Sequence, residues 1–151
     1  MDSRKKDGRY QRLYAQLGEL LLKRSVHISR LSTVAAVLSH KMDHFFWTGF
    51  YLLDKGELFA GPYQGPVACQ HLEKDKGVCW AGINRNETII VPDVELFPGH
   101  IACDSRSRSE IVGPLRDNAG KIIGVLDVDS AELSAFDNID AVWLEKIVAL
   151  I

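Results

Sequence analysis

Apolar residues that recur every three or four positions predict two helices near the N-terminus. The first helix starts at about Tyr10, and its apolar face carries Tyr10, Leu13, Tyr14, Leu17, Leu20 and Leu21. The second carries Leu31, Val34, Ala35, Leu38 and Met42. Ser29 is placed to cap the second helix, because its hydroxyl can accept a free backbone N–H. Residues 1–8 are strongly charged and are expected to form a flexible extension.

After the second helix the pattern changes to that of strands. Residues 45–53 are dense in aromatic and branched side chains, as in a largely buried strand. The turn residues 54–56 and the segment 57–60 that follows them predict a hairpin. Residues 61–66, GPYQGP, are so rich in glycine and proline that we predict a loop.

The second half of the chain is predicted to supply the rest of a sheet and a closing helix. The expected elements are a short helix at 77–84, strands at 88–91, 109–115 and 121–129, and a helix at 136–151. Short turns join strands that follow each other, so the central sheet should be mainly antiparallel. With the N-terminal and C-terminal helices packed on it, the fold class is α+β. A length of 151 residues fits one domain, 1–151.

Composition narrows the class of protein. Hydrophobic residues make up 46% and charged residues 25%, and the net charge is -2, so no basic face is available for a nucleic acid. The N-terminal segment has no apolar run typical of a signal peptide, and no stretch approaches the roughly 20 apolar residues of a membrane span. We therefore expect a cytoplasmic protein without nucleic-acid or membrane partners. His27, His40 and His44 are expected at the surface or at helix ends.

The three cysteines, Cys69, Cys79 and Cys103, are the first candidates for chemistry. A reducing compartment disfavours structural disulfides, and an odd number of cysteines without a Cys-x-x-Cys motif is not a disulfide framework. Inert buried thiols, a metal site and redox chemistry remain open. Cys69 with His71 and Cys103 with His100 could ligate zinc, but the usual closely spaced cysteine pairs are missing, so we expect no metal.

Cys103 lies in the most unusual segment of the chain. Residues 93–108 form a long polar stretch, and long loops inside compact domains are commonly functional. Polar surroundings with nearby backbone N–H groups lower the pKa of a thiol and favour the nucleophilic thiolate. A half-buried thiol that only fills space explains this segment equally well.

Cys79 also admits two interpretations. It opens the helix predicted at 77–84, and a helix N-terminus favours a thiolate. Its apolar neighbours Val78 and Trp80 favour a structural thiol instead. If the loops bring two of the three sulfurs together, one can attack and another can resolve the resulting sulfenic acid as a disulfide. The residues alone leave open which two these are.

Three acidic residues form the next candidate group. Asp127 and Asp129 alternate within the apolar strand predicted at 121–129, and Glu110 lies near the start of the preceding strand. Residues two apart in a strand share a face, so both aspartates project together while Val128 points to the other side. Carboxylates on a buried face repel each other and lose hydration, so at least one should have a raised pKa or hold a cation. On a solvent-facing strand both would merely be hydrated, but the apolar flanking residues favour the buried arrangement.

Seven short segments also carry recognisable motifs: 47–52 WTGFYL, 61–65 GPYQG, 77–79 GVC, 91–94 VPDV, 97–105 FPGHIACDS, 109–112 SEIV and 124–130 GVLDVDS. Together they resemble the free methionine-(R)-sulfoxide reductases, a family of single GAF domains. The resemblance runs from about Tyr10 to the C-terminus without large gaps. The segment that ends in CDS is specific to this family and is not expected in a general GAF sensor.

The resemblance implies a GAF-like fold and the reduction of free L-methionine-(R)-sulfoxide to L-methionine, through a cysteine sulfenic acid and an intramolecular disulfide. The implied catalytic residues are Cys103 as the nucleophile, Cys69 as the resolving partner and Cys79 as an auxiliary thiol. The implied substrate-binding residues are Trp47, Tyr51, Glu110, Asp127 and Asp129. The three acids would bind the substrate's ammonium group and activate the sulfoxide, and the two aromatic residues would line the pocket. The resemblance also implies a homodimer that thioredoxin recycles, with no cofactor and no metal.

Two positions depart from the family pattern. A glycine commonly follows the GVC motif, where this chain has Trp80, and a hydrophobic residue is usual where Gly113 stands. The nucleophile and the three acids are all present, so activity is expected.

The alternative is a non-catalytic GAF sensor that binds a small ligand. A sensor would not need the cysteines and is usually fused to an output domain, for which 151 residues are expected to leave no room.

Overall fold

The first helix begins earlier than its hydrophobic spacing predicted. In a computed structural model that describes all 151 residues, helix α1 spans Ser3–Leu20. The prediction of a flexible extension over residues 1–8 was wrong. Asp2 caps α1, because its side chain accepts a hydrogen bond from the backbone N–H of Lys5 at 3.0 Å. Polar residues at a helix start can therefore be as ordered as an apolar stripe when a cap satisfies the free N–H groups.

Helix α2 spans His27–Lys41, and its apolar stripe lies in the core as predicted. The expected Ser29 cap was wrong, because Ser29 already lies inside the first turn. Val26 occupies the N-cap position and makes no side-chain hydrogen bond there. Packing of the apolar face therefore stabilises this helix without help from a cap.

The predicted hairpin is present, but its second strand is longer than predicted. Strand β1 spans Trp47–Asp54 and β2 spans Glu57–Gln64, so the segment predicted as a loop is strand as far as Gln64. The register between β1 and β2 shifts between Gly49 and Tyr51, where Gly61 and Pro62 of β2 both lie opposite Phe50, so Pro62 belongs to a bulge in β2. A bulge leaves a residue without a ladder partner, so proline's missing N–H is tolerated there.

Six strands form one sheet in the order β3-β2-β1-β6-β5-β4, and every neighbouring pair is antiparallel. The remaining strands are β3 His71–Leu72, β4 Ile89–Val91, β5 Ser109–Arg116 and β6 Ile122–Ser130. The mainly antiparallel sheet and the α+β class are thereby confirmed. Strand β6 lies at the centre, between the first hairpin and β5, which brings its acidic residues beside both.

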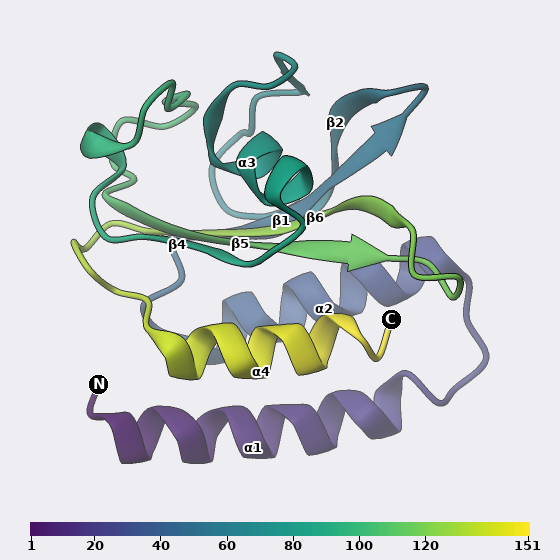
Figure 1. The fold of residues 1–151 in the computed structure, drawn as a ribbon. Coiled ribbons are helices and arrows are strands. Elements are labelled where there is room, and N and C mark those ends of the chain that lie inside the picture. The colour runs from purple at the N-terminus through teal and green to yellow at the C-terminus, as the bar shows by residue number, and fades with distance from the viewer.

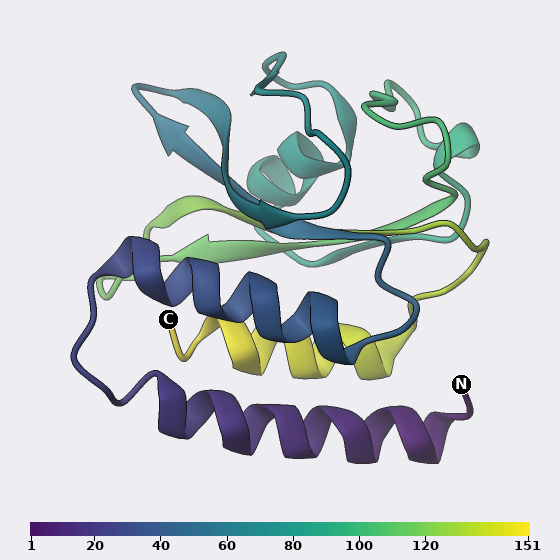
Figure 2. The same cartoon turned by 180° about the vertical axis from the view of Figure 1, so that it is seen from behind.

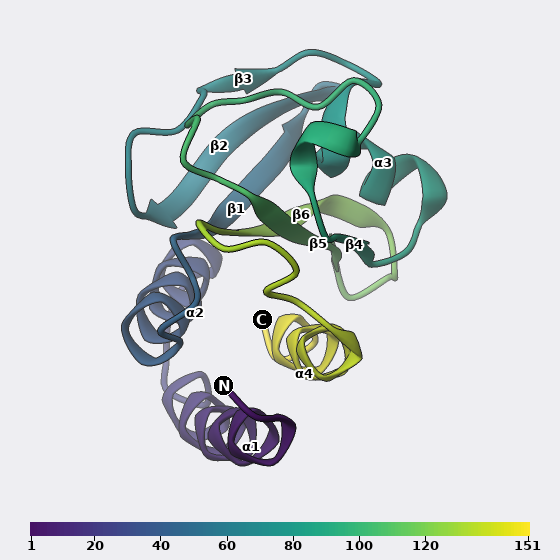
Figure 3. The same cartoon turned by 90° about the vertical axis from the view of Figure 1, so that its left-hand side faces the viewer.

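Helices cover the two faces of this sheet unequally (Figures 1 and 2). Helices α2 and α4 (Asn138–Val148) pack on one face, and α1 lies outside them, as the end-on view in Figure 3 shows. Helix α3 (Gly77–Arg85) and the short 3-10 helix η1 (Val94–Leu96) lie over the other face. One core of 18 buried residues lies on the side of the three helices, and a second of 12 lies on the side of α3. No helix combines the length and apolar character that a membrane span requires.

A buried polar network joins the helices on the first face. Asp140 of α4 is fully buried and accepts hydrogen bonds from Lys6 Nζ at 2.7 Å and Tyr10 Oη at 2.5 Å. His44 Nε2 lies 3.2 Å from the same carboxylate with a side chain only 11% exposed, so His44 follows the end of α2 but is not a surface residue. Burial alone would raise the pKa of Asp140, but these hydrogen bonds outweigh it and lower the pKa to about 2.

Replacing this aspartate, Asp140→Asn, is expected to lower the free energy of unfolding by about 2 kcal/mol near neutral pH. The figure follows from the lowering of the pKa from 3.8 to about 2, since each pKa unit corresponds to about 1.4 kcal/mol. Because the folded-state pKa is the lower one, the stabilisation exists above the unfolded-state pKa and disappears as pH falls through the folded-state pKa. The free energies of unfolding of the wild type and the variant, measured by urea denaturation, should therefore become equal as the pH falls from about 4 to 2.

The matched control is Asp43→Asn, because Asp43 pairs with Arg9 but its side chain is 84% exposed. An exposed ion pair contributes less than about 1 kcal/mol, so this variant should stay close to the wild type at every pH. A stability difference for Asp140→Asn that does not change with pH would contradict the electrostatic explanation and indicate a packing defect.

Candidate functional site

A pocket opens on the face of the sheet that carries α3. The space between its walls, with the solvent-open mouth included, is about 590 Å³. Strands β1, β5 and β6 contribute its floor, and α3 and the loops at residues 67–76 and 100–107 contribute its walls. Residues that are far apart in the sequence therefore meet in one concave site.

The three acidic residues lie together on the floor of this pocket. Strand pairing sets Glu110 directly opposite Asp129 and Val112 opposite Asp127. Asp127 and Asp129 both line the pocket, while Val128 between them lies in the core on the helix side. Antiparallel register thus brings two acids of β6 beside one of β5.

Burial dominates the electrostatics of these acids. Glu110 and Asp127 are each 5% exposed, and no lysine, arginine or histidine forms an ion pair with any of the three. Burial raises the pKa of Glu110 well above its usual range, and the charges of Asp127 and Asp129 add to the effect. The pKa of Asp129 is also well raised, by burial and then by Asp127, and burial raises that of Asp127. The group therefore loses its protons less readily than free carboxyls do, and it lacks a counter-ion.

Two of the three cysteines are bonded to each other. Cys69 and Cys103 form a disulfide with an S–S distance of 2.02 Å and a Cα–Cα distance of 5.5 Å, and Cys103 lines the pocket. Because both sulfurs are used, neither can ligate zinc beside His71 or His100, and the zinc arrangement considered from the sequence is absent.

Cys79 remains as the free thiol, and it is buried. It lines the pocket from α3, with its sulfur within 4.8 Å of carboxylate oxygens of Glu110 and Asp127. Of the two interpretations of Cys79, the structure therefore favours the buried thiol over a thiolate at the helix N-terminus. Burial raises the pKa of Cys79, and the charges of the neighbouring carboxylates raise it further.

Aromatic side chains form one wall of the pocket. Trp47 and Tyr51 line it from β1 and stack at a centroid distance of 5.6 Å. Trp47 also stacks on Tyr63 at 5.2 Å, and its indole N–H donates to the carbonyl of Pro66 at 3.1 Å. These contacts hold the tryptophan in one orientation at the edge of the site.

Sequence reasoning did not assign two charged residues of the pocket. Lys76 precedes the GVC motif and pairs with Glu73 at 3.0 Å, and Asp104 follows Cys103 and pairs with Arg106 at 2.8 Å. Hydrogen bonds from Arg106 lower the pKa of Asp104 to about 2, so this carboxylate is ionised. Sequence position could have indicated both residues, because Lys76 precedes the GVC motif and Asp104 lies within the motif that ends in CDS.

The two departures from the family pattern lie outside the pocket. Trp80 is buried under α3, where its indole N–H donates to the carbonyl of Leu72 at 3.2 Å. A Cβ added at Gly113 would meet only the hydroxyl of Thr88, at 3.6 Å. Neither residue lines the pocket, although Trp80 follows Cys79 and bonds to Leu72, and both of those residues line it.

Gly49 permits the close packing beneath Trp47, and Gly49→Ala is expected to lower the free energy of unfolding by about 1–3 kcal/mol. An added Cβ would lie 2.3 Å from Cβ of Tyr63 and 2.8 Å from the ring of Trp47, so β1 and β2 would have to separate. Thermal denaturation measures the loss. Gly18→Ala is the control, because no atom lies within 4 Å of its added Cβ, and it should not destabilise. Equal stability of Gly49→Ala and wild type would contradict this packing.

An antiparallel sheet with a small-molecule pocket opposite its helix layer is the architecture of a GAF domain, and the GAF domain family profile matches residues 31–151. GAF domain-containing protein A of Dictyostelium discoideum is 48% identical over 97% of this chain and 92% of its own length. The free methionine-R-sulfoxide reductase of Escherichia coli is 38% identical over 93% of this chain and 84% of its own length. The crystal structure of the free methionine-R-sulfoxide reductase of Neisseria meningitidis in complex with its substrate has a TM-score of 0.92 and 39% identity, covering 99% of this chain and 88% of that one. This chain belongs to the free methionine-R-sulfoxide reductase family of GAF domain proteins.

Proposed function

We propose that this protein reduces free L-methionine-(R)-sulfoxide to L-methionine with its own cysteines. The family supports the substrate, because relatives at 38–48% identity bear the name of this activity. The observation that carries the proposal is the position of Cys103. Its sulfur is bonded to Cys69, and the pocket that it lines also holds Glu110, Asp127 and Asp129. A redox-active sulfur and buried acids in one cavity are what sulfoxide reduction requires.

The first step transfers the oxygen atom to the protein. The Cys103 thiolate attacks the sulfoxide sulfur, and an acid delivers a proton to the oxygen. The attack forms a sulfur–sulfur bond to the substrate. The hydroxyl then moves to the Cys103 sulfur as the substrate's sulfur–oxygen bond and the new sulfur–sulfur bond both break, so methionine leaves with the two electrons that the cysteine loses and Cys103 is left as a sulfenic acid. Glu110 is the acid that we assign, because burial and two neighbouring carboxyls raise its pKa well above the usual range and so favour its protonated form.

The second step forms a disulfide. The Cys69 thiol attacks the sulfenic sulfur of Cys103, and the oxygen leaves as water. The bonded arrangement of these two sulfurs supports Cys69 as the resolving thiol. We assign Cys79 no bond-forming step, since its buried, protonated thiol lies on the floor of the pocket.

Recognition of the free amino acid follows from the unbalanced charge of the pocket. We assign the ammonium group of the substrate to Asp127 and Asp129, which have no cationic partner of their own. Trp47 and Tyr51 would hold the methyl-sulfinyl end by apolar contact. Methionine sulfoxide within a peptide has no such ammonium group and would leave buried carboxyls unpaired, which disfavours its binding.

Thioredoxin is the reductant that we propose, with the cytosol as the location and a homodimer as the assembly. A reducing compartment is needed to restore the Cys69 and Cys103 thiols after each turnover. Cys103 belongs to an exposed stretch of its loop, where an external dithiol can approach the disulfide. Sedimentation equilibrium at micromolar protein tests the assembly, and a monomer would refute it.

The activity is tested by following NADPH consumption with thioredoxin, thioredoxin reductase and free L-methionine-(R)-sulfoxide. Turnover is expected with this substrate and not with the (S) epimer or with N-acetylated methionine sulfoxide. No turnover by folded protein with thioredoxin or with dithiothreitol would refute the activity. Turnover with dithiothreitol alone would refute only the choice of reductant.

A further inference from the structure

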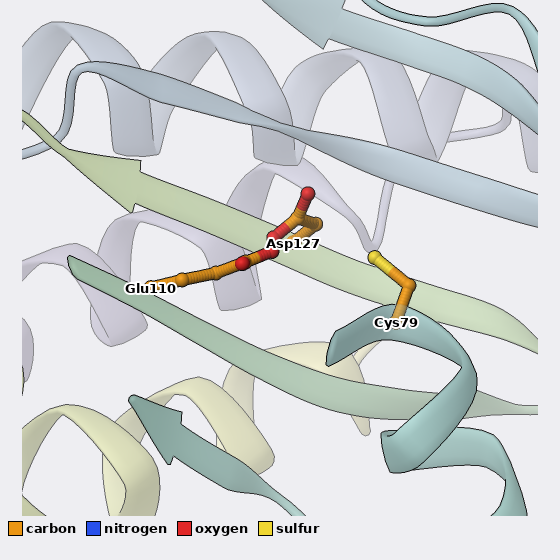
Figure 4. A group of neighbouring side chains, drawn as sticks. All are labelled: Cys79, Glu110 and Asp127. Atoms are coloured by element: carbon orange, nitrogen blue, oxygen red, sulfur yellow. The ribbon is translucent and has the colours of Figure 1, made fainter. Parts of the chain in front are cut away.

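Three potential metal ligands meet on the floor of the pocket, independently of the disulfide. The sulfur of Cys79 and one carboxylate oxygen each of Glu110 and Asp127 all lie within 4.8 Å of one another. Figure 4 shows the thiol of α3 and the side chain of β5 both directed toward Asp127 on β6. Three different elements therefore present one sulfur and two oxygens to the same point.

One buried oxygen of this cluster has no hydrogen-bond partner, and no basic side chain neutralises the cluster. Oδ1 of Asp127 is buried and has no hydrogen-bond partner, and its residue is only 5% exposed. No lysine, arginine or histidine pairs with Glu110 or Asp127. An orphaned buried carboxylate oxygen costs free energy, and a cationic ligand at this point would satisfy it.

We propose that Cys79, Glu110 and Asp127 form a binding site for a thiophilic divalent cation of the zinc class. One thiolate and two carboxylates are a ligand set that such an ion accepts, whereas magnesium and calcium avoid sulfur. Zinc–sulfur and zinc–oxygen bonds of about 2.3 and 2.1 Å set ligand atoms roughly 3.5 Å apart in a tetrahedron. The three ligand atoms here all lie within 4.8 Å of one another, so small side-chain movements suffice to reach that geometry. The fourth position faces the pocket and is open to water. The ion would release the thiol proton to solvent as it binds.

Occupation of this site has a consequence for the proposed activity. The ion would lie where we place the ammonium group and the acid, so it should inhibit in competition with free methionine-(R)-sulfoxide. That consequence rests on the proposed function, but binding of the ion does not. The disulfide is not involved, so the oxidised and the reduced protein should both bind the ion.

Cobalt titration of the oxidised protein tests the site without any assay of activity. With Cys69 and Cys103 bonded, Cys79 is the free thiol, so a thiolate-to-cobalt charge-transfer band can arise only there. We expect one equivalent of Co²⁺ to produce this band in the near ultraviolet and Zn²⁺ to displace it. Cys79→Ser should lose the band, and Asp127→Asn should weaken binding more than about tenfold.

The control variant is Glu95→Gln, which removes an exposed carboxylate outside the pocket and should bind Co²⁺ as the wild type does. Circular dichroism confirms the fold of each variant. Absence of the band in folded wild type would overturn the site. So would a band that persists in folded Cys79→Ser, or, should that variant not fold, unchanged affinity in Asp127→Asn.

Discussion

Cys103→Ser should abolish sulfoxide reduction, with turnover reduced more than about a thousandfold, because a serine hydroxyl cannot accept the oxygen and become a sulfenic acid. The substitution only replaces a sulfur atom with an oxygen atom in an exposed loop, so the fold should persist. Initial rates with free methionine-(R)-sulfoxide and thioredoxin measure the loss. Retained turnover would end the proposed mechanism.

Cys69→Ser separates the two steps and serves as the companion variant. It keeps the nucleophile but cannot form the bond to Cys103, so one equivalent of methionine should appear in a burst and turnover with thioredoxin should then stop. Ser105→Ala, an exposed neighbour of the nucleophile, is the control and should turn over normally. Normal steady-state turnover by Cys69→Ser would show that another thiol resolves the sulfenic acid.

Glu110→Gln should lower kcat by about a hundredfold to a thousandfold, because the amide cannot deliver the proton that the departing oxygen needs. The side chain is 5% exposed and faces the same pocket as Cys103, so the amide preserves its shape and contacts. KM should change little, since the ammonium group is assigned to the two aspartates. Steady-state kinetics with dithiothreitol as reductant separates kcat from KM.

A substitution at an aspartate assigned to the ammonium group should have the opposite kinetic effect to Glu110→Gln. Asp129→Asn should raise KM more than it lowers kcat, because it removes a charge from ammonium recognition. Glu95→Gln again controls for loss of an exposed carboxylate. A Glu110→Gln enzyme with normal kcat would contradict its role as the acid.

The sequence predicted the sheet and most of the helices because their signals are local. A high density of aromatic and branched residues identified β1, apolar runs on either side of a turn identified β5 and β6, and three-and-four spacing identified α1 and α2. The errors arose where a long-range partner decides local structure. Pro62 is accepted in a strand because it lies in a bulge of β2, and residues 1–8 are ordered in part because Lys6 reaches Asp140 in α4.

The site divides in the same way. Alternation along β6 alone placed Asp127 and Asp129 on one face, and the family motif singled out Cys103, while the roles of these residues remain predictions. No periodicity could show that Cys79 faces carboxylates rather than a thiolate-stabilising helix end. Its pKa depends on desolvation and on charges from two other strands, and these exist only after the chain folds.

Local side-chain pattern thus determined the elements of this protein, since helix and strand periods are properties of neighbouring residues. Tertiary structure alone decided which thiols meet, which acids lose water and which polar groups stay unpaired. Those properties depend on distances between residues separated by 34 positions, as for Cys69 and Cys103, and burial sets their energies.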